Sequence, residues 1–411
     1  MGGPSVTESL WRNRDFMLLW TGQIISSVGS MMTFIALPLL VLEVSRSPRQ
    51  AGLALTFFSA PYFFLALPAG ALVDRWNRKY VMILCDAGRA ITLGSLPVAL
   101  FLGHLTLAQL YLAALLTGTL FVFFNVAEPA ALTQVVSKEQ LSSATARNEI
   151  IEPGSALAGP PLSGALFQLW RGLPFAVDAV SYAISAISLL FIRKEFQAVR
   201  PAAPLDLRSG ISQGLSWLWR HRLIRFVALL TGGANFVFSG TFLVVIVLAR
   251  SQHAPPPTIG AIFSIAAVGG LLGALVSVHV QRRLSFGQAI IGVEWLLALI
   301  FPLYALAPNP VALGAITAGL YFLNPIYNVI QYSYRLALIP DALQGRVNSV
   351  FRLLAFGTQP LGSALSGILI QSVGPRITAL VFATCLVLCA IAASLNAHVR
   401  RAPPIEQVAN L

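Results

Sequence analysis

Several ionisable side chains of this sequence lie inside long apolar stretches, where the chemistry open to them is the binding and release of protons. Glu128 and Glu294 each fall within such a stretch, and Glu294 has no cation close to it in the sequence. A carboxyl group in a bilayer-spanning segment must be paired or protonated, so it is treated by default as a functional group. Glu128 and Glu294 are therefore our candidates for proton coupling.

Three further acids stand closer to the ends of apolar stretches and have simpler interpretations. Glu149 and Glu152 begin one stretch. The neighbouring cations Arg147 and Lys138 could neutralise them. Asp178 stands near the start of another stretch, a position typical of a helix cap. The sequence does not decide which acid binds a proton.

Asp86 and Arg89 are a pair of opposite charges within one apolar stretch. Their spacing of three residues places both side chains on one face of a helix. Buried charges are stable only when they are paired and hydrogen-bonded. We interpret the two residues as an intramembrane charge pair, with a part in proton coupling as the alternative.

The composition indicates that these apolar stretches cross a membrane. Hydrophobic residues make up 56% of the 411-residue chain and charged residues 10%, with a net charge of +12. A soluble protein of this length needs a larger charged surface. The cations lie in short loops, which argues against nucleic acid as a partner. Cys85, Cys385 and Cys389 lie in apolar runs without metal-ligand spacing. We expect neither a metal site nor an enzyme.

The apolar runs are about 20 residues long, the length that crosses a bilayer core as a helix. Backbone groups in lipid must be paired within their own segment, so the spans are expected to be helical. The first run is too long for a cleaved signal peptide. The twelve predicted spans cover residues 16–43, 50–73, 79–102, 105–127, 147–169, 173–193, 224–249, 257–280, 286–306, 309–332, 347–371 and 375–397.

The loops between these spans differ in charge. Of the 27 Lys and Arg residues, 21 fall in the termini and in alternate loops, and only five fall in the opposite set of loops. Positive residues favour the cytoplasmic side of a membrane. We therefore predict a multi-pass protein of the inner or plasma membrane with both termini in the cytoplasm.

A long polar stretch divides the chain into two halves of six spans. The predicted parts are an N-terminal bundle over 1–195, a cytoplasmic linker over 196–222, and a C-terminal bundle with a short cytoplasmic tail over 223–411. Within the linker, Ile211, Leu215 and Leu218 have helical spacing. This pattern predicts an amphipathic helix on the membrane surface, with an unstructured tether as the alternative.

The two halves repeat each other at a fixed offset. Asn148 is followed by Pro160 just as Asn348 is followed by Pro360, an offset of 200 residues. Duplicated bundles that face each other enclose a central cavity, where a substrate binds near the midplane and access alternates between the two sides. Chance similarity of helices rich in Gly and Pro is the alternative.

On these residues the chain resembles a twelve-span transporter of the major facilitator superfamily, most closely the drug/macrolide and siderophore (enterobactin-like) exporter branch. The segment 70–79 resembles the loop motif between spans two and three. Asp86 with Arg89 resembles the span-three pair of that branch, and 159–164 resembles the exporter motif of span five. The resemblance covers nearly the whole chain. It implies an all-α membrane protein of two pseudo-symmetric six-helix bundles.

The loop motif supplies the residues of an expected conformational latch. Gly70 allows a close helix contact, and Asp74 can face the N-terminus of a neighbouring helix, where an anion is favoured. The resemblance implies that this neighbour is span eleven. Arg75, Arg78 and Lys79 can pair with Asp74 or with anionic lipid headgroups. We expect the latch to hold the cytoplasmic side closed, with a purely topological anchor as the alternative.

Gly159, Pro160 and Gly164 form the expected packing motif of span five. Small residues let helices approach closely in a membrane, and Gly269 and Gly273 of span eight offer a matching face. A generic contact between small residues is the alternative. The exporter motif ends in a double glycine that this chain lacks, so the direction of transport stays open.

The resemblance further implies that the first helix of each three-helix repeat lines the cavity. The polar residues expected there are Gln23, Ser27, Asn125, Asn235, Asn324, Asn328 and Gln331. The aromatic residues that accompany them are Phe34, Phe121, Phe236, Phe238, Tyr321 and Tyr327. Such walls suit a partly apolar, amphiphilic molecule. For each polar residue, a hydrogen bond that joins two helices is the alternative.

Together these features predict a secondary active transporter that exports a small amphiphilic organic compound, such as a drug, macrolide or siderophore, in exchange for protons. No nucleotide-binding loop is present in the sequence, so an ion gradient is the expected energy source and no cofactor is expected. The expected partners are the substrate, protons and membrane lipid, and the protein is expected to be a monomer. The alternatives are an importer or facilitator of a small metabolite and a non-transporting membrane sensor.

Overall fold

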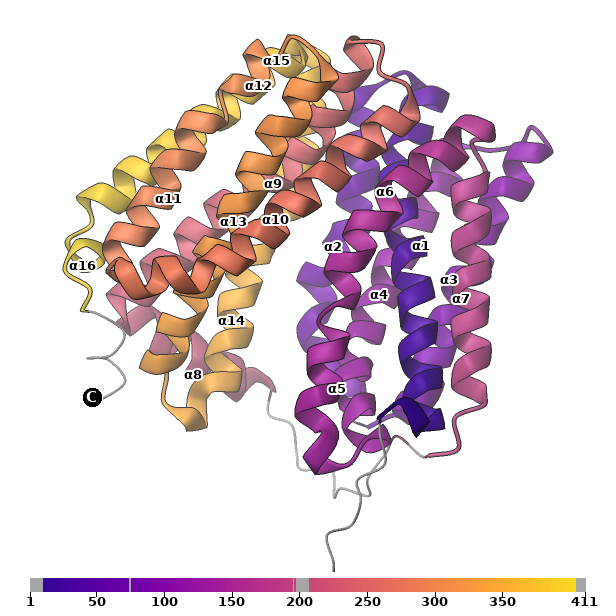
Figure 1. Cartoon of the computed structure of the whole chain (residues 1–411), viewed down its shortest axis with the longest axis horizontal. Coiled ribbons are helices and arrows are strands. Elements are labelled where there is room, and N and C mark those ends of the chain that lie inside the picture. Colours follow the sequence, from indigo (N-terminus) through magenta and orange to yellow (C-terminus); the bar gives the residue numbers. More distant parts are fainter. Residues whose placement is uncertain (1–9, 74, 195, 197–206, 404–411) are drawn as a thin grey trace, which may run out of the picture.

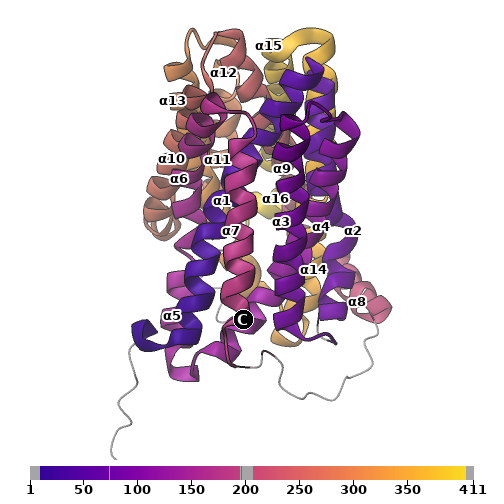
Figure 2. The same ribbon diagram turned by 90° about the vertical axis from the view of Figure 1, so that its right-hand side faces the viewer.

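The structure is a computed structural model, and it describes residues 10–73, 75–194, 196 and 207–403. Every regular element in these ranges is a helix, and the helices form two bundles that stand side by side (Figure 1). Turned by 90°, Figure 2 shows the long helices α1, α3 and α7 running between the two ends of the molecule. The architecture therefore places most of the chain in parallel or antiparallel membrane-length helices.

The first bundle holds the helices that precede the linker. They are η1 (Leu10–Arg12), α1 (Arg14–Ser45), α2 (Pro48–Val73), α3 (Arg78–Phe101), α4 (Leu107–Val135), η2 (Lys138–Gln140), α5 (Leu141–Asn148), α6 (Ile151–Leu169) and α7 (Leu173–Leu190). Short polar side chains begin several of them. Asn13 accepts a hydrogen bond from the first turn of α1, Asn77 from that of α3, and Thr106 from that of α4.

The second bundle follows α8 (Leu207–Arg220), whose glycine Gly214 packs closely on the backbone of Arg346. Its helices are α9 (Arg222–Ser251), α10 (Pro256–Arg283), α11 (Phe286–Ile300), α12 (Leu303–Leu306), α13 (Pro310–Leu338), η3 (Asp341–Leu343), α14 (Gln344–Phe356), α15 (Gln359–Leu395) and α16 (Ala397–Arg400). The helix α8 thus lies against α14.

Ten segments of the described residues are helical, long and apolar enough to cross a bilayer. One of them, 344–395, contains two passes, because the helix α15 is interrupted at Gly374. There φ is +82°, a left-handed conformation that glycine adopts without the clash a Cβ would cause. The interruption separates the predicted spans 347–371 and 375–397. The helix α6 provides the remaining predicted pass.

The fifth pass differs from the single helix predicted over 147–169. It consists of α5 and α6, which are separated by Glu149 and Ile150. The periodic apolar pattern does not reveal this break, because polar residues at 138–149 resemble an ordinary loop. The predicted span 286–306 is likewise divided into α11 and α12, and Pro302 stands at the division.

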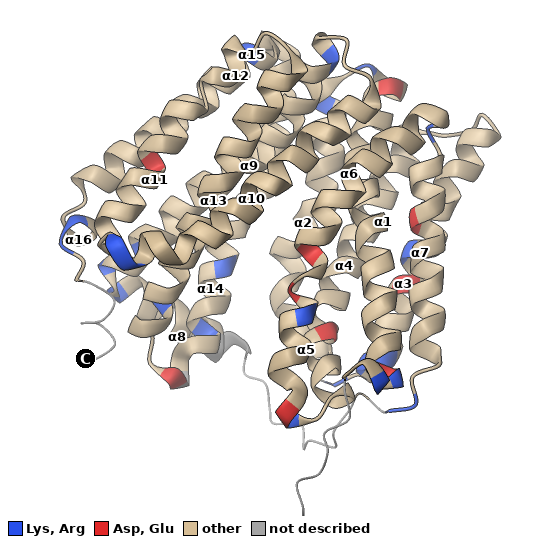
Figure 3. Cartoon of the chain, viewed as in Figure 1, with Lys and Arg blue, Asp and Glu red and all other residues tan. Residues whose placement is uncertain are grey.

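The two ends of the molecule differ in charge and in how the bundles meet. We call the end that carries α5 and α8 the α5–α8 end, and the other the α12 end (Figure 1). Lys and Arg residues gather mainly at the α5–α8 end (Figure 3). The bundles touch through the pairs α6–α10 and α2–α15, and their ribbons diverge towards the α5–α8 end (Figure 1).

Candidate functional site

The first bundle contains a pocket of about 290 Å³, which we call the polar pocket. Its wall comes from α1, α3, α4 and the junction between α5 and α6. It is lined by Gln23, Ser26, Ser27, Ser30, Arg89, Phe121, Phe124, Asn125, Glu128, Asn148, Glu149, Ile151 and Glu152. Residues that the sequence analysis singled out in separate spans therefore lie together here, among them Gln23, Ser27, Arg89, Asn125 and Glu128.

Glu128 connects α4 to the break in the fifth pass. Asn148, the last residue of α5, donates a hydrogen bond from Nδ2 to Glu128 Oε1 at 2.7 Å. The carboxylate is half-buried at the edge of the pocket, so it can be reached by a bound molecule. An ionised carboxylate accepts this bond more strongly than a protonated one. A change in the charge of Glu128 would therefore change the strength of the hydrogen bond that joins α4 to the end of α5.

Glu149 and Glu152 do not form the ion pairs that we expected. Both are exposed in the polar pocket, and within the described residues no cation lies at ion-pair distance from either carboxylate. Arg147 instead places its guanidinium over the ring of Trp11, 4.4 Å from its centroid. The planar guanidinium favours an aromatic face, so Arg147 is held away from the two acids.

Arg89 is the cation of the polar pocket and is itself neutralised. Its Nη2 lies 2.5 Å from Asp86 Oδ1, and both side chains are almost fully buried. Its guanidinium lies between two rings, 4.6 Å from the centroid of Phe124 and 4.2 Å from that of Tyr182. Nη1 also donates to the Tyr182 hydroxyl at 3.2 Å. These contacts fix Arg89 in the pocket wall and satisfy much of its charge.

Asp178 does not cap a helix, contrary to our expectation. It is the sixth residue of α7 and is fully buried. Thr33 of α1 donates to its Oδ2 at 2.5 Å, and Ser181 donates to its Oδ1 at 3.1 Å. A Cβ at Gly29 would come within 2.3 Å of Oδ1, so this glycine leaves room for the carboxyl group. Asp178 therefore joins α7 to α1.

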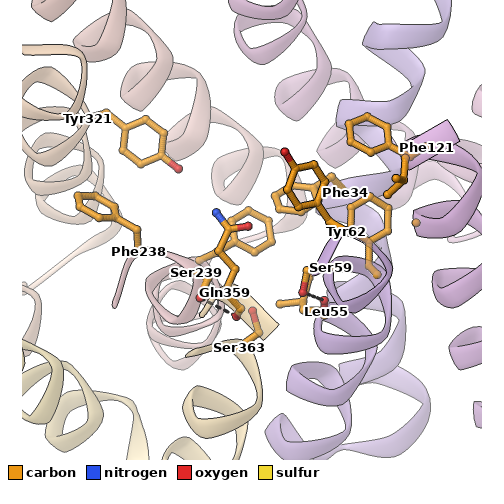
Figure 4. A pocket seen from close by; sticks show the side chains of 14 residues that line it. Phe34, Leu55, Ser59, Tyr62, Phe121, Phe238, Ser239, Tyr321, Gln359 and Ser363 are labelled. Carbon is orange, nitrogen blue, oxygen red and sulfur yellow. Dashed lines mark hydrogen bonds between the residues drawn. The ribbon is translucent and has the colours of Figure 1, made fainter. Parts of the chain in front are cut away.

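A second pocket of about 310 Å³ lies between the bundles, and we call it the aromatic pocket (Figure 4). The first bundle contributes α1, α2 and α4, and the second contributes α9, α13 and α15. It is lined by Phe34, Leu55, Phe58, Ser59, Tyr62, Gly118, Phe121, Val122, Phe238, Ser239, Phe242, Tyr321, Gln359 and Ser363. Phe121 also lines the polar pocket, so the two pockets are neighbours.

Part of the wall of the aromatic pocket was not predicted from the sequence. We expected the cavity to be lined by the first helix of each three-helix repeat, which gives Phe34, Phe121, Phe238 and Tyr321. The helix α2 adds Phe58 and Tyr62. The spacing of Leu55, Phe58, Ser59 and Tyr62 places them on one helix face, but the sequence does not show that this face meets the other bundle.

Four polar residues expected to line the cavity from the second bundle do not line either pocket. Asn235 donates to the backbone oxygen of Ala355 at 2.8 Å and so joins α9 to α14. Asn328 donates to Asn324 at 2.8 Å along α13, and Gln331 is buried. Two expected aromatic residues also pack elsewhere. The ring of Phe236 lies edge-on to that of Phe382, and Tyr327 shares a hydrogen bond with Thr231.

Glu294 lies in the core of the second bundle and away from both pockets. It is fully buried on α11, and neither carboxylate oxygen has a hydrogen-bond partner among the described residues. The helix packs against α13 and α15. A lone buried charge costs more than protonation does, so we expect a neutral carboxylic acid here.

The fifth pass packs against the eighth as predicted and through the predicted Gly164, but the glycine that α10 contributes is Gly260. A Cβ at Gly164 would lie 2.3 Å from the oxygen of Pro256, and one at Gly260 would lie 2.1 Å from that of Pro160. Gly159 instead faces Met31 of α1. The predicted partners of span five face α13: Cβ atoms at Gly269 and Gly273 would come within 2.3 and 2.0 Å of Ala318 and Phe322 oxygens.

Two further contacts join the bundles near the α12 end. Gly52 of α2 faces Gly367 of α15, where a Cβ at Gly52 would lie 2.8 Å from the Gly367 Cα. Glu43 of the first bundle pairs with Arg171 at 2.5 Å and also lies 4.0 Å from Arg250 of the second bundle. The bundles are therefore held together at this end by backbone contact and by a cross-bundle charge contact.

The expected latch lies partly outside the described residues, because Asp74 is among those not described. Gly70 makes no close contact in this conformation, since a Cβ there would meet no atom within 4 Å. Lys79 donates to the Ile192 oxygen at 2.7 Å, beyond the end of α7, and Arg75 is exposed. Arg346, just before the predicted eleventh span 347–371, donates a hydrogen bond to Gln213 of α8.

Two helical bundles with a pocket between them, closed at one end and diverging at the other, define an alternating-access membrane transporter. The sequence profile of the Major Facilitator Superfamily matches residues 19–356. The chain belongs to this superfamily, which confirms the predicted fold and family. Its relatives are transporters and not enzymes.

The relatives include efflux pumps. The chain is 27% identical over 393 residues to the multidrug efflux pump Tap of Mycobacterium tuberculosis, covering 90% of each. It is 25% identical over 357 residues to the enterobactin exporter EntS of Salmonella typhimurium, covering 86% of this chain and 84% of the exporter. These matches confirm the predicted resemblance to drug and siderophore exporters.

Solved structures share the fold at low sequence identity. The nucleoside transporter NupG has a TM-score of 0.70 and 17% identity, with 94% of this chain and 100% of NupG covered. A bacterial homologue of the lysosomal transporter Spinster, in an inward-facing unoccupied conformation, has a TM-score of 0.74 and 14% identity, with 93% and 97% covered. At these identities the likeness concerns the fold alone.

Proposed function

We propose that this protein is a proton-coupled exporter of a small amphiphilic organic compound. The observation that supports it most is the adjacency of the two pockets at Phe121, which places an apolar aromatic wall beside a wall that carries ionisable acids. An apolar pocket with a few polar groups suits an amphiphilic ligand. The names of the relatives Tap and EntS agree with outward transport of such compounds.

Glu128 is our choice for the proton-binding residue. It lines the pocket, it is accessible, and its bond to Asn148 connects its charge to the broken fifth pass. Glu294 was an equal candidate from the sequence, but it lies in neither pocket and has no polar partner in the described part of the chain. In this proposal substrate and proton act on the same pocket, so binding of one can favour release of the other.

The α5–α8 end faces the cytoplasm in this proposal, with both termini on that side. Its richness in Lys and Arg supports the orientation (Figure 3). The bundles meet at the α12 end, so this conformation loads substrate from the cytoplasm. The latch of Gly70, Asp74, Arg75, Arg78 and Lys79 would act after the bundles rock together at the α5–α8 end. We take the protein to work as a monomer in contact with membrane lipid, with its bundles bounded as the sequence predicts.

The test is a transport assay with a defined gradient. Cells with and without the protein are first compared in a growth-inhibition panel to find an exported compound, and its efflux is then measured before and after a protonophore collapses the proton gradient. We expect accelerated efflux that stops with the gradient. Efflux that is equal in both conditions would refute proton coupling. Net uptake into right-side-out vesicles, driven by the same gradient, would instead establish the importer.

A further inference from the structure

Four exposed arginines lie at the corner of the second bundle where α10, α11 and α16 meet. Arg282 and Arg283 belong to the last turn of α10, Arg400 ends α16, and Arg401 follows it. Lys and Arg residues are visible beside α16 in Figure 3. We propose that these four residues, which we call the arginine cluster, bind the phosphate group of an anionic phospholipid. The cluster lines neither pocket, so this site is separate from that of the transported compound.

The packing of α16 on α11 brings the two pairs of arginines to one corner. The helix α11 begins directly after α10, and a Cβ at its Gly287 would lie 2.3 Å from the Val399 oxygen and 3.3 Å from the Arg400 Cα. Val399 is fully buried, and Asn396 begins α16 by accepting hydrogen bonds from two backbone N–H groups. The turn that carries Arg400 and Arg401 is therefore folded against the bundle and holds a fixed place beside the end of α10.

The four side chains have no partner among the described residues. None of them takes part in an ion pair or in a side-chain hydrogen bond within those ranges. Other basic side chains at the α5–α8 end are bound by the protein itself: Lys79 donates to the Ile192 oxygen at 2.7 Å, and Arg225 donates to the Trp219 oxygen at 3.0 Å. Like charges at one corner repel each other. A bound anion would remove this repulsion.

The second bundle offers little negative charge of its own. Between residues 207 and 403 the chain contains two acids, Glu294 and Asp341. Glu294 is buried in α11, and Asp341 of η3 accepts a hydrogen bond from Gln344 at 3.0 Å. Neither acid forms an ion pair in the part of the chain that the structure describes. The counter-charge of the arginine cluster must therefore come from outside these residues.

The cluster lies where apolar, lipid-facing surface ends. Leu275 and Val278 of α10 and Leu395 of α15 are each more than half exposed. Exposed apolar side chains of membrane spans contact acyl chains, because the hydrocarbon core surrounds the helix over its apolar length. The arginines follow these residues directly in both segments, so they stand at the level of the headgroups. A ligand that combines a phosphate with acyl chains fits both surfaces at once.

The type of cation also fits a phosphate ligand. Every basic residue other than histidine between residues 207 and 403 is an arginine, and lysine does not occur there. The planar guanidinium group donates two parallel hydrogen bonds to two oxygens of one phosphate, which the ammonium group of lysine does not do. Basic clusters next to membrane spans are typical binding sites for anionic headgroups.

Lipid binding to the purified full-length protein in a nonionic detergent tests this inference. Native mass spectrometry measures the fraction of protein that carries a lipid as phosphatidylglycerol, or phosphatidylcholine with the same acyl chains, is added. We expect phosphatidylglycerol to bind at least about tenfold more tightly, because its headgroup carries a net negative charge. It should also raise the thermal unfolding midpoint, since a ligand of the folded state stabilises that state. Inorganic phosphate at the same concentration should not displace it, because it lacks the acyl chains.

Two double variants locate the site. Arg282→Gln with Arg283→Gln, and Arg400→Gln with Arg401→Gln, should each weaken binding of phosphatidylglycerol by about 25-fold, which corresponds to about fivefold for each arginine. Without lipid, both variants should unfold at the wild-type temperature, because the four side chains have no partner in the described residues. A loss in both variants shows that the two segments bind one lipid together.

A matched control removes the same number of charges elsewhere. Arg49→Gln with Arg376→Gln changes two exposed residues near the α12 end and should leave binding at the arginine cluster unchanged. Equal binding of phosphatidylglycerol and phosphatidylcholine to the wild-type protein would overturn the inference. So would site variants that bind like the control, or displacement by inorganic phosphate. Glu406 follows the cluster in the sequence and lies outside the described residues. Lipid binding that appears only after Glu406→Gln would assign the cluster to the protein's own C-terminal segment.

Discussion

The side-chain amide of Asn148 donates a 2.7 Å hydrogen bond to the carboxylate of Glu128, and this bond joins α4 to the last residue of α5. The next two residues, Glu149 and Ile150, separate α5 from α6. A proton or a ligand that neutralises Glu128 would weaken the bond at the point where the fifth pass is already divided. The charge of Glu128 is thus coupled to the packing of the fifth pass.

Glu128→Gln removes the charge and keeps the size of the side chain. We expect gradient-driven efflux to fall at least about tenfold, while exchange of labelled for unlabelled substrate across the membrane continues, because the site can no longer bind and release a proton and the pocket remains. Efflux and exchange are measured in proteoliposomes. Glu139→Gln is the control, and unchanged gradient-driven efflux in Glu128→Gln would assign coupling to another acid.

Glu294→Leu should stabilise the protein and leave transport intact. The buried carboxyl group has no partner for either oxygen in the described residues, and an apolar side chain of similar volume removes that cost of about 1–3 kcal/mol. A higher thermal unfolding midpoint in detergent, together with wild-type efflux, is the expected result. Loss of gradient-driven efflux would make Glu294 the coupling acid instead of Glu128.

Gly164→Leu should prevent the α12 end from closing. A Cβ at this position would lie 2.3 Å from the Pro256 oxygen, so the bundles must separate to admit the side chain. Spin labels on Leu169 and Leu306, exposed residues of the two bundles, would report the separation by distance measurements. Gly154→Leu on the same helix is the control, because a Cβ there meets no atom within 4 Å. Equal distance distributions in both variants would contradict the prediction.

Glu43→Gln should have a smaller effect on the same equilibrium. Its contact with Arg250 is 4.0 Å and partly exposed, and such ion pairs contribute about 0.2–1 kcal/mol. The population open at the α12 end should therefore rise by roughly 1.4-fold to fivefold, by the conversion of 1.4 kcal/mol per factor of ten. The same spin labels measure it, and the effect should disappear in high salt. A shift as large as that of Gly164→Leu would show that charge, and not backbone contact, holds this end.

Arg89→Met should destabilise the first bundle more than the double change Asp86→Leu with Arg89→Met. The single change leaves the Asp86 charge buried without its partner, which typically costs about 3–5 kcal/mol, whereas removal of both charges is often close to neutral. Thermal unfolding of the purified variants in detergent gives the comparison. A double variant that is less stable than either single variant would show that the pair is held for stability.

The sequence predicts the long helices and their neighbours well where the information is local. Apolar runs locate the helices because a membrane span must be long and apolar throughout. The spacing of Asp86 and Arg89 places them on one helix face, and the structure has them 2.5 Å apart. The contact between the fifth and eighth passes was also expected, although Gly260, and not Gly269 or Gly273, makes it.

The remaining relationships depend on contacts between residues far apart in the chain. Asp178 was assigned to a helix cap because its partner Thr33 lies 145 residues away and no local pattern connects them. Phe58 and Tyr62 were missed because an apolar helix gives no sign of which face meets the other bundle. Glu128 and Glu294 looked alike in the sequence. Only their surroundings, a pocket for one and an apolar core for the other, distinguish them.

The aromatic pocket belongs to neither bundle alone. Phe34 of the first bundle and Phe242 of the second have ring centroids 4.4 Å apart, so a molecule held there rests on both. When the bundles pivot, these rings must slide apart and the enclosure loses one of its sides. The affinity for the substrate then falls as a direct result of the motion that opens the binding site to the other side of the membrane. Release of the substrate therefore needs no separate structural element.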